Sequence, residues 1–257
     1  MKILLSFLFI LIVSDLAAQT DSVPGGVYSW AKARPEKTSF GERRKILEGS
    51  SLDLSRLEIH TVLLNAGQSA SGAEVKTDLE KLIIVKEGQL TITIKDSSKT
   101  LGPGSYAVII AGDKHGFKNT SGKPVTYFSL TYTAKSPVNI QRGRDAGGSF
   151  MKDWNQLEVK QTDKGESRPI FDRPSSMFAK FDMHATALNP GIASHDPHTH
   201  RAEEIILMIK GDVQIQLNQS FAPAGSGDVI FYPAYSLHAV KNTGSTQCGY
   251  FAIQWRN

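Results

Sequence analysis

The sequence predicts an all-β protein made of two tandem copies of one small barrel. The chain repeats itself at an offset of 123 to 124 residues, and short apolar or alternating segments end at Gly turns in both copies. Long helical periodicity is absent after the N-terminal segment. With 257 residues, of which 40% are apolar, the chain is long enough for two folded domains of about 120 residues each.

The internal repeat places the domain boundary. Residues 57–67 and 181–191 share His, Leu, Asn and Gly at an offset of 124. Further along, the offset is 123 for four pairs: Gly88 with Gly211, Gly104 with Gly227, His115 with His238, and Asn119 with Asn242. The polar, Gly-rich stretch 141–148 suits a linker. We therefore predict an N-terminal domain at 19–145 and a C-terminal domain at 146–257.

Strands are expected in the same order in both copies. In the first copy they fall at 81–86, 89–94 and 106–110. In the second copy they fall at 204–210, 212–217, 228–232 and 247–255. His60 and its repeat mate His184 occupy ordinary strand positions, for which we favour a structural role over a catalytic one.

The first residues predict a secretory signal peptide at 1–18. A positive start, Met1-Lys2, precedes eleven mostly apolar residues and then small residues near Ala18. Eleven helical residues cover roughly 16 Å, about half of a bilayer core, which argues against a membrane anchor. No Cys lies near the predicted cut, so a lipoprotein anchor is excluded. We expect a protein exported to the periplasm or the extracellular space, with no membrane contact in its mature form.

Charge and cysteine content narrow the classes further. The chain has 29 Lys+Arg against 25 Asp+Glu, with no run of four basic residues. Nucleic-acid binding through a basic patch is therefore not expected. The single cysteine, Cys248, cannot form an intramolecular disulfide, so the fold must depend on its own core.

Three of the seven His residues, His195, His198 and His200, lie within six positions of one another. Residues two apart on an extended strand face the same side, so His198 and His200 can present two imidazoles to one ion. Glu204 can add a carboxylate, and His238 a third imidazole. Such a donor set suits one divalent transition metal, Mn, Fe, Ni, Co or Zn.

The spacing of these residues resembles that of a known family. Residues 198–211 read His-x-His-x3-Glu-x6-Gly, and 227–242 read Gly-x5-Pro-x-Tyr-x2-His-x3-Asn. They resemble the two consensus motifs of the cupin superfamily, with Tyr235 where the second motif usually has Gly. The resemblance covers both halves and implies a bicupin, two tandem double-stranded β-helix (jelly-roll) barrels. It also implies that His198, His200, Glu204 and His238 bind one metal ion.

Two residues close to the predicted ligands, Glu203 and His195, could also be considered as metal ligands. Only Glu204, and not Glu203, keeps the six-residue gap to Gly211, and adjacent strand residues face opposite ways. We therefore choose Glu204. His195 would give the site one His too many, so we expect it beside the ligands or on the surface.

The first copy lacks the full motif. Counting back from Gly88, the ligand positions become Val75, Thr77 and Lys81, and only His115 remains. Glu80 lies one residue out of register. We expect the N-terminal domain to be metal-free and to serve packing, pocket walls or dimerisation.

Function follows from the site and not from the fold. We favour a metal-dependent enzyme acting on a small polar or phenolic molecule, dioxygenase-like or hydrolase- or isomerase-like. The alternative is a non-catalytic protein that binds a sugar or another small ligand. The empty first copy also resembles the Mn-dependent (S)-ureidoglycine aminohydrolases, but that family has Glu, His, His and Gln at the four ligand positions.

Candidate pocket groups are aromatic or amide side chains, each more readily explained as core: Phe231, Tyr235, Tyr250, Gln254 and Trp255. The catalytic residues are not assigned by the sequence. Bicupins often pair sheets between subunits, so the resemblance implies a monomer or a homodimer.

Overall fold

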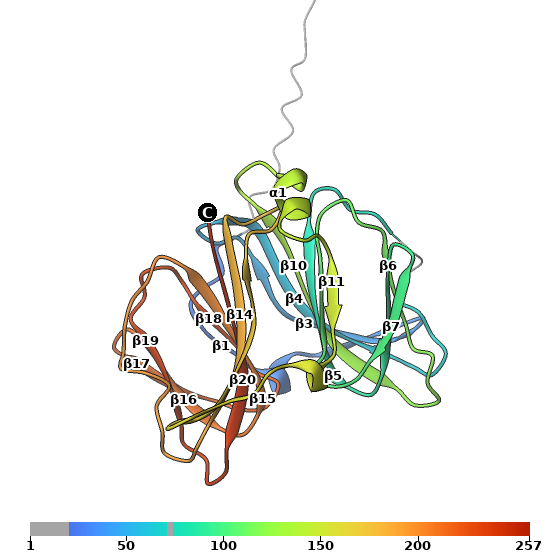
Figure 1. The fold of residues 1–257 in the computed structure, drawn as a ribbon. Coiled ribbons are helices and arrows are strands. Elements are labelled where there is room, and N and C mark those ends of the chain that lie inside the picture. Colours follow the sequence, from blue (N-terminus) through green and yellow to red (C-terminus); the bar gives the residue numbers. More distant parts are fainter. Residues whose placement is uncertain (1–20, 71–73) are drawn as a thin grey trace, which may run out of the picture.

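The computed structural model describes residues 21–70 and 74–257, and within them the chain forms twenty strands, one short α-helix and two 3-10 turns. Figure 1 shows two barrels side by side, each made of one large and one small sheet. The large sheets lie face to face in the middle of the molecule, and the small sheets lie on the outer sides. The predicted all-β fold of two tandem barrels is confirmed.

The N-terminal barrel has a seven-stranded sheet in the order β11-β8-β5-β10-β4-β3-β2 and a three-stranded sheet in the order β7-β6-β9. Its strands are β2 (Pro35–Thr38), β3 (Gly41–Gly49), β4 (Leu54–Leu64), β5 (Glu80–Glu87), β6 (Leu90–Ile94), β7 (Ser97–Leu101), β8 (Tyr106–Ile109), β9 (His115–Lys118), β10 (Val125–Ala134) and β11 (Phe150–Lys152). Neighbouring strands are antiparallel, as expected of such barrels.

The C-terminal barrel repeats this arrangement with a seven-stranded sheet, β1-β18-β15-β20-β14-β13-β12, and a three-stranded sheet, β17-β16-β19. Its strands are β1 (Gly26–Tyr28), β12 (Lys160–Thr162), β13 (Gly165–Arg173), β14 (Lys180–Leu188), β15 (Glu203–Lys210), β16 (Val213–Leu217), β17 (Ser220–Ala224), β18 (Val229–Tyr232), β19 (His238–Asn242) and β20 (Cys248–Arg256). The strands predicted in each copy are present to within a residue or two at their ends.

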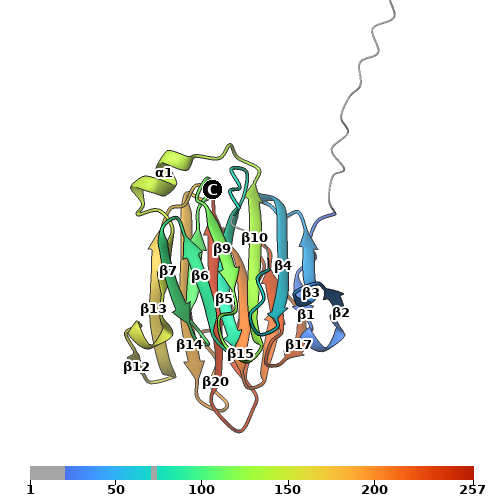
Figure 2. The ribbon, with the colours of Figure 1, turned by 90° about the vertical axis from the view of Figure 1, so that its right-hand side faces the viewer.

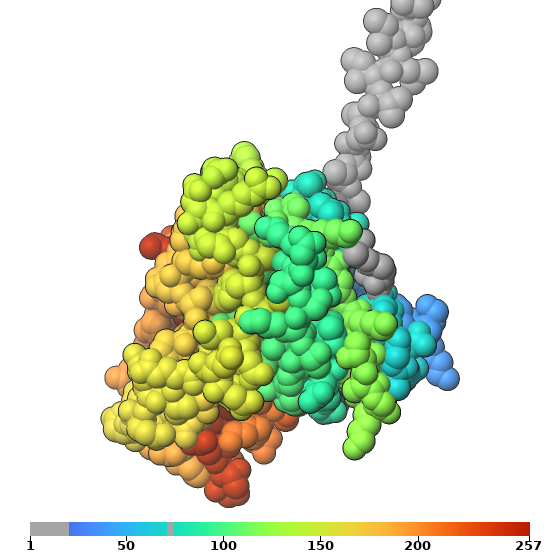
Figure 3. Space-filling view, turned by 45° about the vertical axis from the view of Figure 1, so that its right-hand side comes forward, coloured from blue at the N-terminus to red at the C-terminus, as the bar shows by residue number. Residues whose placement is uncertain are grey.

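The two halves exchange their first strands. β1, from the N-terminal half, pairs with β18 of the C-terminal barrel, and β11 pairs with β8 of the N-terminal barrel. β11 follows the short helix α1 (Ile140–Asp145) and so lies beyond the boundary predicted at residue 145. Figure 2 shows α1 at one end of the barrels, and Figure 3 shows the yellow segment after it lying between the two barrels on the surface.

Side-chain alternation divides the core into three parts. On β20, Phe251, Ile253 and Trp255 belong to a cluster shared by both large sheets. The intervening residues Tyr250 and Ala252 point into the C-terminal barrel and join its own cluster. The N-terminal barrel has a separate apolar filling. Because successive strand residues face opposite sides, each large sheet serves its own barrel and the interbarrel core together.

The predicted signal peptide falls at 1–18, outside the described residues. Within 21–70 and 74–257, no helix has the length and apolar character needed to cross a bilayer.

Candidate metal centre

The four predicted ligands meet inside the C-terminal barrel. Imidazole nitrogens of His198, His200 and His238 all lie within 4.8 Å of one another. Glu204 Oε2 lies 3.4 Å from His200 Nε2 and 3.2 Å from His238 Nε2. Glu204 and His238 are almost fully buried, at 5% and 3% exposed. The spacing-based prediction that these side chains converge is therefore matched by the geometry.

Backbone pairing brings His198 to the cluster, although it does not lie on a regular strand. An isolated bridge joins it to His238, with backbone hydrogen bonds of 3.2 Å from His198 N and 3.0 Å from His238 N. His200 follows in the same loop, and its carbonyl accepts a 2.7 Å bond from Tyr235 N. Glu204 is the second residue of β15 and faces inward. One loop and the first residues of two strands thus supply the four donors.

The hydrogen bonds of the rings favour metal binding through Nε2. His200 Nδ1 lies 2.9 Å from the Ala202 carbonyl, and His238 Nδ1 lies 2.9 Å from the Ser236 carbonyl. A carbonyl can only accept, so each Nδ1 carries the hydrogen and each neutral Nε2 keeps a free lone pair. Both Nε2 atoms are buried without a hydrogen-bond partner in the described chain. Buried groups of this kind call for a missing partner, and a divalent cation fits them.

The electrostatics of the cluster point the same way. Burial raises the pKa of Glu204, but the imidazoles of His200 and His238 that face its carboxylate outweigh this effect and hold that pKa at about 2. The pKa of His200 is raised by its contact with the Glu204 carboxylate. Burial and then the neighbouring His195 lower the pKa of His198. The site therefore combines a charged carboxylate with imidazoles whose pKa values are shifted in opposite directions. Such a donor set is suited to a divalent transition metal.

His195 contacts the cluster from outside. Its Nδ1 lies 3.0 Å from His198 Nδ1, and its ring packs edge-on against the His198 ring at 4.1 Å. It is not one of the three imidazoles that share the 4.8 Å cluster. The expectation that His195 lies beside the ligands agrees with this position.

A cavity of about 390 Å³ opens beside the cluster. Its wall carries polar and charged side chains that include Lys164, Glu166, His184, Tyr250 and Gln254. Lys164 Nζ donates a 2.8 Å hydrogen bond to the Ser194 carbonyl, which holds the ammonium at the cavity wall. The volume lies within the usual range for small-molecule pockets.

Sequence reasoning found only part of this wall. Tyr250 and Gln254 were among the candidate pocket groups, and they do line the cavity. Phe231 and Trp255 instead belong to the interbarrel core, and Tyr235 is exposed on the outside. His184, for which we favoured a structural role, lines the cavity and lies 3.7 Å from Asp182. Lys164 and Glu166 carried no sequence signal, because only the pairing of β13 with β14 brings them to the site.

Glu203 turns away from the cluster, as the alternation of strand residues predicted. Its carboxylate accepts hydrogen bonds from Ser51 Oγ at 2.7 Å and from Asp53 N at 3.1 Å, both in the N-terminal half. Leu52 N donates a third at 2.9 Å, and the indole of Trp255 a fourth at 3.1 Å. Glu203 therefore joins the barrels and leaves Glu204 as the carboxylate of the cluster.

At the positions equivalent to the four predicted ligands, the N-terminal barrel has different residues. The count from Gly88 predicted Val75 at the position of His198, but this was wrong by one residue. The bridge to His115 is made by Glu74, as His198 bridges His238, because the following loop is one residue longer. By the same pairing, Lys76 and not Thr77 corresponds to His200, since its carbonyl accepts from Gly112 N as that of His200 accepts from Tyr235 N.

Lys81 occupies the place of Glu204. Its ammonium lies 2.5 Å from Glu74 Oε1, and His115 Nε2 lies 3.3 Å from the same oxygen. An ammonium thus stands where the C-terminal barrel has a carboxylate, and Glu74, Lys81 and His115 do not offer the donor set that a divalent cation prefers.

Two tandem barrels with this motif spacing define a bicupin. The cupin domain family matches residues 60–131 and 185–254, together more than half of the chain. The protein belongs to the cupin family.

Among individual proteins, the chain is 24% identical over 185 residues to (S)-ureidoglycine aminohydrolase of Arabidopsis thaliana. That match covers 67% of this chain and 56% of the plant protein, so the chain spans little more than half of that relative. Its fold is similar to oxalate decarboxylase from Lactobacillus farciminis in complex with formate (TM-score 0.70, 13% identity, 91% and 87% of the chains). It is also similar to protein Ylba from E. coli (TM-score 0.69, 19% identity, 94% and 95%).

Proposed function

We propose that the C-terminal barrel binds one divalent transition-metal ion through His198, His200, Glu204 and His238. The observation that carries the proposal is the pair of buried Nε2 atoms, on His200 and His238, that face Glu204 without a hydrogen-bond partner in the described chain. Mn, Fe, Ni and Zn all accept such a donor set.

We further propose that the protein is an enzyme for a small polar substrate that carries a carboxylate. A bound divalent ion supplies Lewis-acid chemistry, polarising a carbonyl or lowering the pKa of a water. Lys164, on the cavity wall, would pair with the substrate carboxylate, and Gln254 would hydrogen-bond a neighbouring polar group. Glu166 and His184 are the groups of the wall that can hold or transfer a proton.

The named relatives support this substrate class. Ureidoglycine and oxalate, after which two of them are named, are both small carboxylates. We do not extend either activity to this chain, because it covers 56% of the plant relative and is only 13% identical to the decarboxylase. The ligand positions also differ. In chain order they are His, His, Glu and His here, whereas ureidoglycine aminohydrolases are associated with Glu, His, His and Gln. Among the reaction types, a hydrolase or lyase fits the acid and base groups of the wall better than a dioxygenase.

A metal-loading and activity experiment tests the proposal. Metal-depleted protein is loaded separately with Mn, Fe(II), Ni or Zn and assayed on small ureido, hydroxy and dicarboxylic acids, under air and under nitrogen. We expect turnover with at least one metal under both gases, and a raised KM in Lys164→Gln. Lys160→Gln, at an exposed site on β12, is the matched control and should behave like the wild type.

Other outcomes separate the alternatives. Turnover that requires air would favour a dioxygenase. Saturable binding of the acids without turnover under any condition would favour the non-catalytic binding protein. Loss of activity in Lys160→Gln as great as in Lys164→Gln would contradict the role given to Lys164.

We also propose that the protein acts outside the cytoplasm. The support is the charged start, the apolar stretch and the small residues of 1–18. N-terminal sequencing of the protein from its native host should find a chain that begins near residue 19. A mature chain that still begins at Met1 would contradict export.

A further inference from the structure

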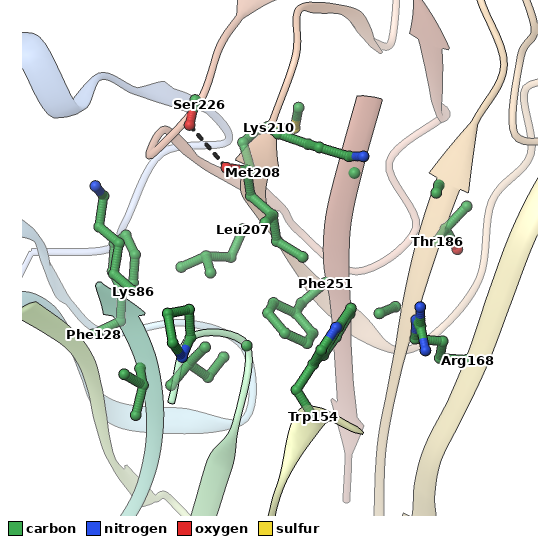
Figure 4. Close-up of a pocket in the computed structure, with 18 of the residues that line it drawn as sticks. Lys86, Phe128, Trp154, Arg168, Thr186, Leu207, Met208, Lys210, Ser226 and Phe251 are labelled. Atoms are coloured by element: carbon green, nitrogen blue, oxygen red, sulfur yellow. Dashed lines mark hydrogen bonds between the residues drawn. The ribbon is translucent and has the colours of Figure 1, made fainter. Parts of the chain in front are cut away.

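A second cavity lies between the two barrels. It measures about 430 Å³, within the usual range for small-molecule pockets. Its lining is largely aromatic and aliphatic, with Phe128, Trp154, Leu207 and Phe251 among its residues (Figure 4). We call it the interbarrel cleft. It shares a short stretch of wall, at Glu166 and 186–187, with the cavity beside the His cluster.

The cleft lies where the two repeats meet, and its two phenylalanines are repeat equivalents. Phe128 corresponds to Phe251, and each packs against a tryptophan: Trp30 with Phe128 at 5.9 Å, and Trp154 with Phe251 at 5.7 Å. Trp30 and Trp154 are themselves 124 residues apart. Each indole also has an arginine over its ring, at 5.0 Å for Arg44 and 4.5 Å for Arg168.

The symmetry is broken in the charges around the cleft. Lys86 also covers Trp30, at 5.0 Å, but its repeat equivalent beside Trp154 is Ile209. Trp154 lines the cleft, and Trp30 does not. One position further along, Glu87 of the first copy becomes Lys210 in the second. At the edge of the cleft, the second copy therefore has a positive charge, on Lys210, where the first copy has a negative one.

Lys210 is the cation of the cleft that lacks a counterion. Glu87 pairs with Lys86 at 2.5 Å and Glu166 lies 3.6 Å from Arg168, whereas Lys210 makes no ion pair with any described residue. Its stem crosses β20 over Gly249, 3.4 Å from where a Cβ would stand. Figure 4 shows the side chain extending across this strand toward β14, on the side where Arg168 lies.

We propose that the interbarrel cleft binds a small amphipathic anion, an aromatic carboxylate. The flat body of the ligand packs against Trp154, Phe251 and Leu207, where aromatic faces are favourable partners. Its carboxylate pairs with Lys210, the cation of the lining that has no counterion among the described residues. The excess of cations over free carboxylates selects an anion over a neutral or cationic ligand of the same shape.

Binding of 2-naphthoate tests the proposal, measured by calorimetry and by tryptophan fluorescence on the full chain. We expect one saturable site, weakened about tenfold in Lys210→Glu, since hydrogen bonds to charged groups have effects of that size. The neutral analogue 2-naphthylmethanol should bind more weakly than the acid and should not respond to Lys210→Glu. Lys99→Glu, an exposed reversal on β7, is the control and should bind like the wild type.

A metal-free variant separates this site from the metal centre. His238→Ala should bind 2-naphthoate with the affinity of the wild type, whatever becomes of its metal. Dependence of binding on His238, or equal affinity in the wild type and Lys210→Glu, would overturn the proposal. Because Lys210 is exposed, Lys210→Glu is expected to fold, and circular dichroism checks this.

Discussion

Glu80 and Glu203 occupy equivalent positions in the two repeats, and each carboxylate hydrogen-bonds a loop of the opposite barrel. Glu203 accepts from Ser51 Oγ and from the backbone N–H groups of Leu52 and Asp53. Glu80 accepts from Ser176 N at 2.7 Å. The two receiving loops are themselves repeat equivalents, so a pseudo-twofold pair of buried contacts joins the barrels.

The two contacts differ in quality. Glu203 has a fourth donor, Trp255 Nε1, at 3.1 Å. The equivalent of Trp255 is Tyr132, whose hydroxyl makes no hydrogen bond of good geometry with a described residue, and Glu80 Oε2 is also without one. Burial consequently raises the pKa of Glu80, and the nearby hydroxyls only partly oppose the shift.

We predict opposite effects of the two Gln substitutions. Glu203→Gln should lower the free energy of unfolding by about 1–3 kcal/mol, because an amide turned toward four donors leaves buried groups unpaired. Glu80→Gln should raise it at neutral pH, because it removes a buried charge that the fold satisfies poorly. Urea unfolding of the two variants and the wild type measures both effects. A loss of similar size in both would contradict the difference drawn between the two contacts.

The pH dependence of stability gives a second test of Glu80. Its pKa is raised in the folded protein, so the stability it contributes is complete below its unfolded value near 4.5 and is lost as pH rises through the folded value. The advantage of Glu80→Gln over the wild type should therefore grow between pH 4.5 and pH 8. Unfolding curves at four pH values in this window give the comparison. An advantage that shrinks with rising pH would show that the Glu80 carboxyl is better satisfied than its contacts indicate.

The convergence of His198, His200, Glu204 and His238 was predictable because local rules fix their spacing. The gap from Glu204 to Gly211 and the alternation along β15 separate Glu204 from Glu203 without any tertiary information. His198 was expected on a strand and lies in a bridged loop, yet the same two-residue spacing to His200 holds.

The cavity wall and the interbarrel contacts were not predictable in this way. Lys164 reaches the site only because β13 pairs with β14, and β1 joins the opposite barrel only through β18. In the first copy, one extra residue between the bridge and β5 shifted the count from Glu74 to Val75. Sequence spacing detects a motif that is intact, but a degenerate copy needs the backbone pairing to fix its register.

Removal of single ligands should abolish stoichiometric metal binding. We expect one ion per chain in the wild type by elemental analysis, and a sharp loss in each of four variants: His198→Ala, His200→Ala, Glu204→Ala and His238→Ala. Losing one of four donors leaves an open, more hydrated ion that dissociates more easily. His115→Ala, in the N-terminal barrel, should keep one ion. Full occupancy in His200→Ala, or two ions in the wild type, would place the site elsewhere.

Metal affinity should fall with pH, because protons compete for the imidazole nitrogens. The pKa of His200 lies above its ordinary 6.5 because the Glu204 carboxylate lies beside its ring, so the loss should begin above pH 6.5 as the solution is acidified. The pKa of His198 is lowered by burial, so this residue stays neutral to lower pH. Competition with a chromophoric chelator between pH 8 and pH 5 measures the affinity. A constant Kd from pH 8 to pH 6 would contradict His200 as a ligand.

The N-terminal barrel should gain a metal site when its equivalent residues are exchanged. There, Lys81 fills the carboxylate position and pairs with Glu74 at 2.5 Å, while His115 keeps the place of His238. The triple variant Glu74→His, Lys76→His, Lys81→Glu restores three imidazoles and one carboxylate, and we expect it to bind two ions per chain, counted by elemental analysis. Lys81→Gln alone should stay at one ion, because removing the ammonium supplies no new donor set. The control variant Val75→His, Thr77→His, Lys81→Glu tests the register. If this control binds the second ion and the first triple variant does not, Glu74 is not the equivalent of His198.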